Sequence, residues 1–117
     1  MPQYVAFIYS EDIDWSQPDE AHQAEMAEYG AFSEAAAAII RGGAVLYPTA
    51  TATTVRVPGG KGGDVVASDG PYAETKEALT GFFILECADL DEAIAAAARI
   101  PGSWTGAVEV RPVIPRM

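Results

Sequence analysis

The chain has 117 residues, of which 50% are apolar and 9% aromatic, values that are typical of one globular domain and exclude a disordered protein. Its net charge of −10 excludes the basic face that a nucleic-acid partner requires, and it disfavours contact with anionic membranes. No apolar run approaches the roughly 18 to 20 residues of a membrane span. The start lacks a basic leader, and Cys87 alone forms no intrachain disulfide. We therefore expect one cytoplasmic domain over residues 1–117 with an acidic, solvated surface.

The first third of the chain predicts a strand and then a long helix. Residues 4–9 are apolar or aromatic at every position, which is typical of a strand covered on both faces. Residues 16–19 offer a serine cap, an early proline and a first-turn acid, and the helix is expected to run to about Ile40 before stopping at residues 42–43, both glycines. One face of this helix carries His22, Met26, Tyr29, Ser33, Ala36 and Ile40.

The middle of the chain predicts a hairpin. Residues 44–47 and 52–57 are strand-like and are interrupted at Pro48, which cannot donate to a ladder. The glycine-rich residues 58–63 are expected to form its loop, because they lack the spacing of a phosphate-binding loop and no helix follows. Residues 64–68 return as a short strand, and residues 71–76 are expected to form one helical turn.

The last third predicts a second strand–helix–strand unit. Residues 81–87 carry apolar side chains on both faces of a strand. Asp89, followed by Glu92 three residues on, is typical of a helix cap, and residues 101–102 (Pro-Gly) end that helix. Residues 107–111 alternate as a final strand. The expected buried stripe of the helix is Leu90, Ala93, Ile94 and Ala97.

This order predicts an α+β protein with a ferredoxin-like βαββαβ fold, an extra β-hairpin between the halves, and an antiparallel sheet with two helices on one face. Two helices cover only one face, yet residues 4–9 and 82–87 are apolar on both. A bare second face would exceed the apolar patches typical of monomers. We therefore expect a homodimer in which two sheets pack face to face.

Residues 69–77 (Asp-Gly-Pro-Tyr-Ala-Glu-Thr-Lys-Glu), followed by residues 81–86 (Gly-Phe-Phe-Ile-Leu-Glu), resemble the signature of the YCII-related family in its DGPF-domain branch. The resemblance covers nearly the whole chain and departs from the branch's name at Tyr72, which stands where that name has Phe. It implies a dimeric α+β barrel, and it implies a setting near extracytoplasmic-function sigma factors, beside which relatives are often encoded. It supplies no reaction. Its other matches are Gly43, Pro48 and residues 52–56, 89–93 and 106–112.

The turn that begins at Asp69 holds most of the candidate site residues. Asp69 either accepts hydrogen bonds from backbone amides ahead of it or acts as a general acid or base at a cleft, with Tyr72 beside it. Glu74 and Lys76 are interpreted as a solvated pair, with each other or with Arg56. The candidates for ligand binding or turn stabilisation are Gly70, Pro71, Glu74 and Lys76.

His22 is the only histidine, and therefore the only side chain whose ordinary pKa lies near neutrality. The family resemblance implies a His–Asp dyad, which here would be His22 with Asp69. The alternative is a half-buried histidine at a helix start, where the helix dipole disfavours its charged form. One His and one Cys supply no metal-ligand spacing, so neither a metal nor a cofactor is expected.

Two classes of function stay open. One is a cofactor-independent acid–base enzyme of isomerase, lyase or dehalogenase type, acting on a small molecule near Asp69, Tyr72 and His22. The other is a non-catalytic homodimer that binds a small organic ligand near the Asp-Gly-Pro-Tyr turn, or a regulatory module. A pocket at Asp69 would favour the enzyme, whereas Asp69 bonded to backbone amides would favour the module.

Overall fold

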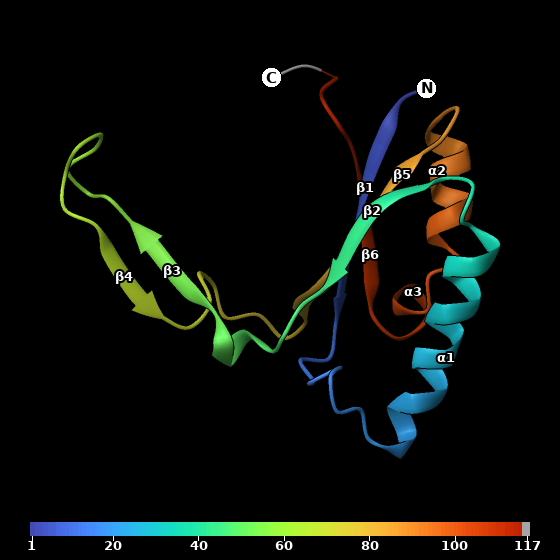
Figure 1. Cartoon of the computed structure of the whole chain (residues 1–117), viewed down its shortest axis with the longest axis horizontal. Coiled ribbons are helices and arrows are strands. Elements are labelled where there is room, and N and C mark those ends of the chain that lie inside the picture. The colour runs from blue at the N-terminus through green and yellow to red at the C-terminus, as the bar shows by residue number, and fades with distance from the viewer. Residues whose placement is uncertain (116–117) are drawn as a thin grey trace.

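The computed structural model describes residues 1–115, which form a two-layer body and a projecting ribbon (Figure 1). The helices lie on one side of the main sheet, and the ribbon extends from the other side. The elements in chain order are β1 (Gln3–Ser10), α1 (Glu20–Ala35), β2 (Ile40–Val45), the 3-10 turn η1 (Thr49–Thr51), β3 (Thr53–Arg56), β4 (Val66–Asp69), β5 (Ala78–Glu86), α2 (Leu90–Ala97), α3 (Gly102–Thr105) and β6 (Ala107–Pro112).

The main sheet confirms the predicted fold class. Its strands follow the order β2-β5-β1-β6 and every neighbouring pair is antiparallel, as in a ferredoxin-like βαββαβ fold. Strands β3 and β4 form a separate two-stranded antiparallel sheet, which is the predicted extra hairpin between the two halves. The interruption after β2 also falls where it was expected, because η1 begins directly after Pro48.

The two faces of the sheet have different cover. Alternate residues of β1, from Tyr4 to Ser10, are buried beneath the helices, while Val5, Phe7 and Tyr9 between them are only half-buried. The ladder pairs β1 residues 4 and 6 with β5 residues 85 and 83, so the helix-facing set continues on β5. The opposite face is also apolar, with no helix of residues 1–115 over it (Figure 1).

Helix α1 is shorter than predicted at both ends. Its cap is Asp19 rather than a serine, since the Asp19 carboxylate accepts the backbone N–H of His22 at 2.9 Å. The helix ends at Ala35, and the expected glycine stop lies inside β2 instead. A Cβ on Gly43 would lie 2.5 Å from the carbonyl oxygen of Phe82, so this glycine permits close strand pairing rather than ending a helix.

Helix α2 confirms the predicted cap, with the Asp89 carboxylate accepting the backbone N–H of Glu92 at 2.9 Å. The predicted stripe is partly wrong, because Leu90 and Ile94 are about half exposed. The helix turns a face of small residues to the sheet, which allows closer packing; the buried residues are Ala93, Ala96 and Ala97. Two local predictions fail as well, since the short helix α3 was not expected and residues 71–76 form bends rather than a helical turn.

Candidate functional site

A cleft of about 740 Å³ lies between α1 and the strands β2 and β5. Helix α1 contributes the side chains of Met26, Tyr29 and Ser33 to its wall. These three belong to the helix face predicted from the sequence, and Ala36 of the same face is buried in the core at the C-terminal cap of the helix. The core residue of α1 that the predicted face omits is Phe32. The other residues of its wall are Ile8, Trp15, Ser16, Gly30, Ile40, Gly42, Gly43, Ala44, Val45, Leu46, Tyr47, Thr80, Gly81, Phe82 and Phe83.

The wall of this cleft is apolar with scattered hydroxyl groups, and it contains no charged side chain. Its hydroxyls come from serine, threonine and tyrosine, which both donate and accept hydrogen bonds. Three neighbouring glycines of β2 and β5 keep one side of the wall thin. Such a surface suits a small molecule with an apolar body and a few neutral polar groups.

One hydroxyl of the cleft wall, that of Thr80, is paired with a second hydroxyl from β1. The Ser10 and Thr80 hydroxyls lie 3.0 Å apart, and both residues are buried. The Thr80 hydroxyl also lies 3.4 Å from the carbonyl oxygen of Ile8. Because buried polar groups need partners, this bond fixes the ends of β1 and β5 against each other.

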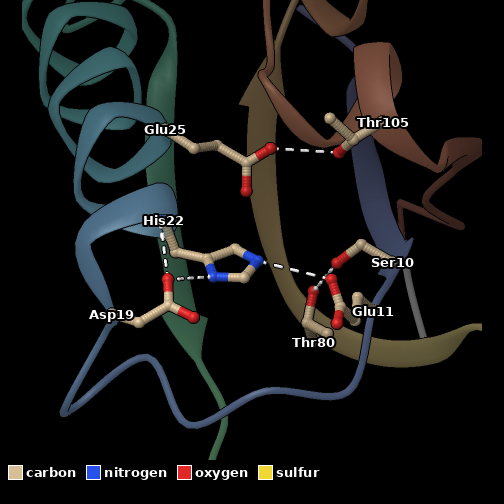
Figure 2. Close-up of polar contacts among 7 residues, drawn as sticks. All are labelled: Ser10, Glu11, Asp19, His22, Glu25, Thr80 and Thr105. Atoms are coloured by element: carbon tan, nitrogen blue, oxygen red, sulfur yellow. Dashed lines mark hydrogen bonds and ion pairs between the residues drawn. The ribbon is translucent and has the colours of Figure 1, made fainter.

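His22 lies between two carboxylates at the start of α1 (Figure 2). Its Nδ1 is 2.6 Å from Asp19 Oδ1, the same oxygen that caps the helix, and its Nε2 points to Glu11 at 3.3 Å. The cap therefore fixes the imidazole as well as the helix. Glu25, one turn further along α1, accepts the Thr105 hydroxyl at 3.0 Å and ties the helix to α3 (Figure 2).

The hydrogen bond that the His22 ring donates to the Asp19 carboxylate raises the pKa of His22 above its ordinary value of 6.5, and Glu11 adds to this effect. The same bond lowers the pKa of Asp19. The helix dipole was expected to disfavour the imidazolium, but the adjacent carboxylates favour it. The imidazole of His22 therefore holds its proton more tightly than a free histidine does.

Trp15 connects this cluster to the cleft. Its ring packs edge-on against His22, with centroids 5.6 Å apart, and against Tyr29 at 6.1 Å. Both Trp15 and Tyr29 line the cleft, whereas His22 lies behind the indole. Burial, together with the charge of Glu25, raises the pKa of Tyr29 to about 12, so its phenol stays neutral and able to donate.

The structure separates Asp69 from His22. Asp69 ends β4 on the ribbon, on the other side of the sheet from α1 (Figure 1). Its side chain is exposed, and within residues 1–115 its carboxylate accepts no backbone amide. The turn is instead held by Gly70, whose N–H donates to the Ala52 carbonyl at 2.8 Å and whose carbonyl accepts the Thr54 hydroxyl at 2.9 Å.

The other turn candidates lie on the same exposed segment. Tyr72 is 76% exposed, and the Arg56 guanidinium lies over its ring at 5.0 Å. Glu74 and Lys76 are exposed and form no ion pair among the described residues, so the expected pair is not formed there. Pro71 is half-buried, and Gly70 has a φ of +99°, a conformation that favours glycine.

Sequence reasoning placed the site at this turn and missed the cleft. Trp15 lies in a loop outside every motif that the sequence offers, and the Ser10–Thr80 pair joins residues 70 positions apart. The one available signal was the face of α1 with Met26, Tyr29 and Ser33, which mixes apolar and polar groups as a cleft wall does.

Two findings concern cofactors and membranes. Across residues 1–115, His, Cys, Asp and Glu side chains form no group of three or more that could hold a metal ion. The helices of the same region are too short or too polar to cross a membrane.

Fold and cleft together define an α+β protein of ferredoxin-like topology with a hollow beside its first helix. The family model of the YCII-related domain matches residues 3–116, and the chain belongs to that family. A protein of Rhizobium meliloti (strain 1021), described as uncharacterized protein R00369, is 44% identical over 70 residues, which are 58% of this chain and 54% of the relative. The chain thus spans about half the length of that relative.

A solved structure shares the fold. It is 5-chloro-2-hydroxyhydroquinone dehydrochlorinase from Burkholderia phenoliruptrix AC1100 in complex with 2,5-dihydroxybenzoquinone. It matches with a TM-score of 0.50 and 16% identity, over 93% of this chain and 90% of that one. At this identity the likeness shows the fold alone.

Proposed function

We propose that the protein is a homodimer that binds a small, neutral, ring-sized organic molecule in the cleft between α1 and the strands β2 and β5. The observation that carries this proposal is a hollow of about 740 Å³ whose wall has hydroxyl groups but no charged side chain. Ligand sites typically measure about 300–1,000 Å³ and combine an apolar wall with a few polar groups. A hydroxylated aromatic ring fits that description.

Charge favours a neutral ligand over an anion. The chain carries a net charge of −10, and the wall offers no Lys or Arg to a carboxylate or phosphate. The carboxylates of Glu11 and Asp19 lie beside His22, whose ring packs against the wall residue Trp15. An anionic ring therefore meets repulsion that a phenol does not.

Calorimetric titration with resorcinol, a neutral dihydroxybenzene, tests the cleft, with benzoate as the anionic comparison. Gly30→Leu fills the hollow, because Gly30 lines it and a Cβ there meets nothing within 4 Å. Leucine also improves helix propensity, by about 1 kcal/mol at most, so lost binding would not reflect unfolding. Ala31→Leu adds the same side chain at an exposed position outside the wall and is the matched control.

We expect resorcinol to bind more tightly than benzoate, and Gly30→Leu to weaken it by about tenfold or more, or 1.4 kcal/mol. Ala31→Leu should leave the affinity within a factor of about two to three. Equal binding by wild type and Gly30→Leu would refute this use of the cleft.

An acid–base enzyme is the second candidate, and His22 is the observation that favours it. Its imidazole is fixed by Asp19 and touches the Trp15 ring that lines the cleft. The protein that shares the fold is a dehydrochlorinase. Such an enzyme removes HCl from its substrate: the C–Cl bond breaks, chloride leaves, and a base accepts the proton that the substrate loses. Chloride release from 5-chloro-2-hydroxyhydroquinone tests this role. It should occur with wild type and drop sharply in His22→Gln; equal release by both would exclude His22.

The turn around Asp69 and Tyr72 stays a separate prediction as a ligand contact. Both side chains are exposed and free to meet a molecule that approaches from outside the chain. The resorcinol titration checks it directly. Asp69→Asn and Tyr72→Phe should each weaken binding if the turn takes part, and unchanged affinities would remove it from the site.

The homodimer is proposed from the open face of the sheet. Val5, Phe7 and Tyr9 of β1 are half-buried there, and the neighbouring β5 adds Phe82 and Ile84. A second copy that packs its own open face against this one would remove both patches from water. Sedimentation velocity tests the dimer independently of ligand binding.

A further inference from the structure

The β3–β4 ribbon, with the residues that join it to the body, is an arm held to the body at its base, where the Thr49 N–H donates to the Asp12 carboxylate at 3.1 Å. The arm comprises residues 48–77, and it projects from the side of the sheet that has no helices (Figure 1). The radius of gyration is 16.2 Å, against about 13 Å for a compact chain of this length. An isolated two-stranded hairpin is marginally stable in water, so the arm needs a surface to lie on.

The ribbon has an apolar face of its own. Val55 pairs with Ala67 across the ladder, and Val57 and Val65 continue the same alternation one step beyond the paired residues. Val55 and Val65 are 61% and 68% exposed. The opposite face carries polar side chains, Thr54, Arg56 and Ser68, beside Val66.

The length of the arm is similar to the thickness of a second copy, measured from its sheet to its helix layer. A sheet with one layer of helices is roughly 20 Å thick, because a helix is about 10 Å across and packed layers lie about 10 Å apart. The long axis of 46 Å spans from the ribbon across the sheet to the helices (Figure 1), which leaves roughly 25 Å for the ribbon. A second copy on the open face would fill a layer of that depth, so the tip would arrive beside its helices.

Charge allows the same arrangement. The arm holds three of the seven basic residues of the chain, Arg56, Lys61 and Lys76, and four acidic ones, Asp64, Asp69, Glu74 and Glu77. Helices α1 and α2 together hold six acidic residues and no Lys or Arg. Lys61, at the tip of the arm, can therefore form an ion pair with a carboxylate in the helix layer of another copy.

We propose that the arm clasps a second copy of this chain, with its tip beside the helix layer of that copy. This proposal rests on the homodimer proposed above. It names the arm as the segment that holds the two copies together. By two-fold symmetry each copy both extends an arm and receives one. The exposed valines on one face of the ribbon become part of the interface.

Zero-length carbodiimide crosslinking tests the clasp, because both lysines of the chain, Lys61 and Lys76, lie on the arm. The sample is an equal mixture of unlabelled and nitrogen-15-labelled protein, so that mass spectrometry separates links between copies from links within one. We expect Lys61 to join carboxylates of α1 or α2 of the other copy. Lys61→Arg should abolish that link and Lys76→Arg should keep it.

The results of these experiments distinguish three proposals: the clasp, the dimer and the ligand site in the cleft. A sedimenting dimer whose Lys61 links stay within one copy, or are absent, overturns the clasp and leaves the dimer. A monomer overturns both, while resorcinol titration still tests the cleft. As a second measurement, the double variant Val55→Ser with Val65→Ser should raise the dimer dissociation constant by about tenfold or more. The control Val66→Ser, on the other face, should not; equal effects would also overturn the clasp.

Discussion

The buried hydroxyl pair of Ser10 and Thr80 contributes to the free energy of unfolding. Thr80→Val keeps the branched shape of the side chain and removes the hydroxyl that lies 3.0 Å from Ser10. The Ser10 hydroxyl, whose residue is 5% exposed, then stays buried without that partner. Leaving a buried polar group unpaired costs about 1–3 kcal/mol.

Urea denaturation at a fixed protein concentration measures this loss. With a slope of about 2 kcal/mol/M, the midpoint of Thr80→Val should fall by roughly 0.5–1.5 M. Adding Ser10→Ala removes the orphaned hydroxyl too, so the double variant should recover part of the loss. If Thr80→Val matches wild type, or if the double variant is no more stable than Thr80→Val alone, the hydroxyl pair does not stabilise the fold as argued.

The side chains of His22, Asp69 and Cys87 can each be tested by a single measurement or substitution. NMR titration of His22, the only histidine, should give a pKa above 6.5 that falls in Asp19→Asn; an unchanged value would contradict the proposed hydrogen bond. Since folding raises this pKa, the stability advantage of wild type over His22→Gln should be complete below pH 6.5 and disappear as pH rises through the folded value. Asp69→Asn should change stability by less than about 0.5 kcal/mol, because the carboxylate caps no backbone amide; a loss of 1 kcal/mol or more in urea denaturation would restore its architectural role. Cys87 is fully buried and its thiol pKa is raised by burial, so iodoacetamide should alkylate it only as the chain unfolds; rapid reaction in the native state would contradict that burial.

The fold could be predicted because its signals are local. Apolar residues at every position of the strand that contains Phe82 and Phe83 indicated burial on two faces, and Asp89 with Glu92 marked a helix start that the structure confirms. The end of α1 could not be read in the same way. Gly42 and Gly43 resemble a helix stop in sequence, but their role depends on how closely β5 approaches β2, which is a tertiary distance.

The candidate site was only partly predictable for the same reason. His22 was identified from its chemistry, but its partners were not, because Asp19 serves at once as helix cap and as acceptor for the ring. Asp69 drew attention through its turn motif, although that turn lies on the arm. The wall of the cleft combines residues from a loop, a helix and strands that lie far apart in the sequence, such as Trp15 and Thr80. Their proximity therefore could not be predicted from local patterns.

A crystal structure of the protein soaked in resorcinol shows whether the cleft is the ligand site. We expect ordered density for the ring between α1 and β2, in contact with Tyr29 or Thr80, and none there in Gly30→Leu. Resorcinol ordered only elsewhere on the chain, or an empty cleft at saturating concentration, would contradict the proposal that this hollow is the ligand site.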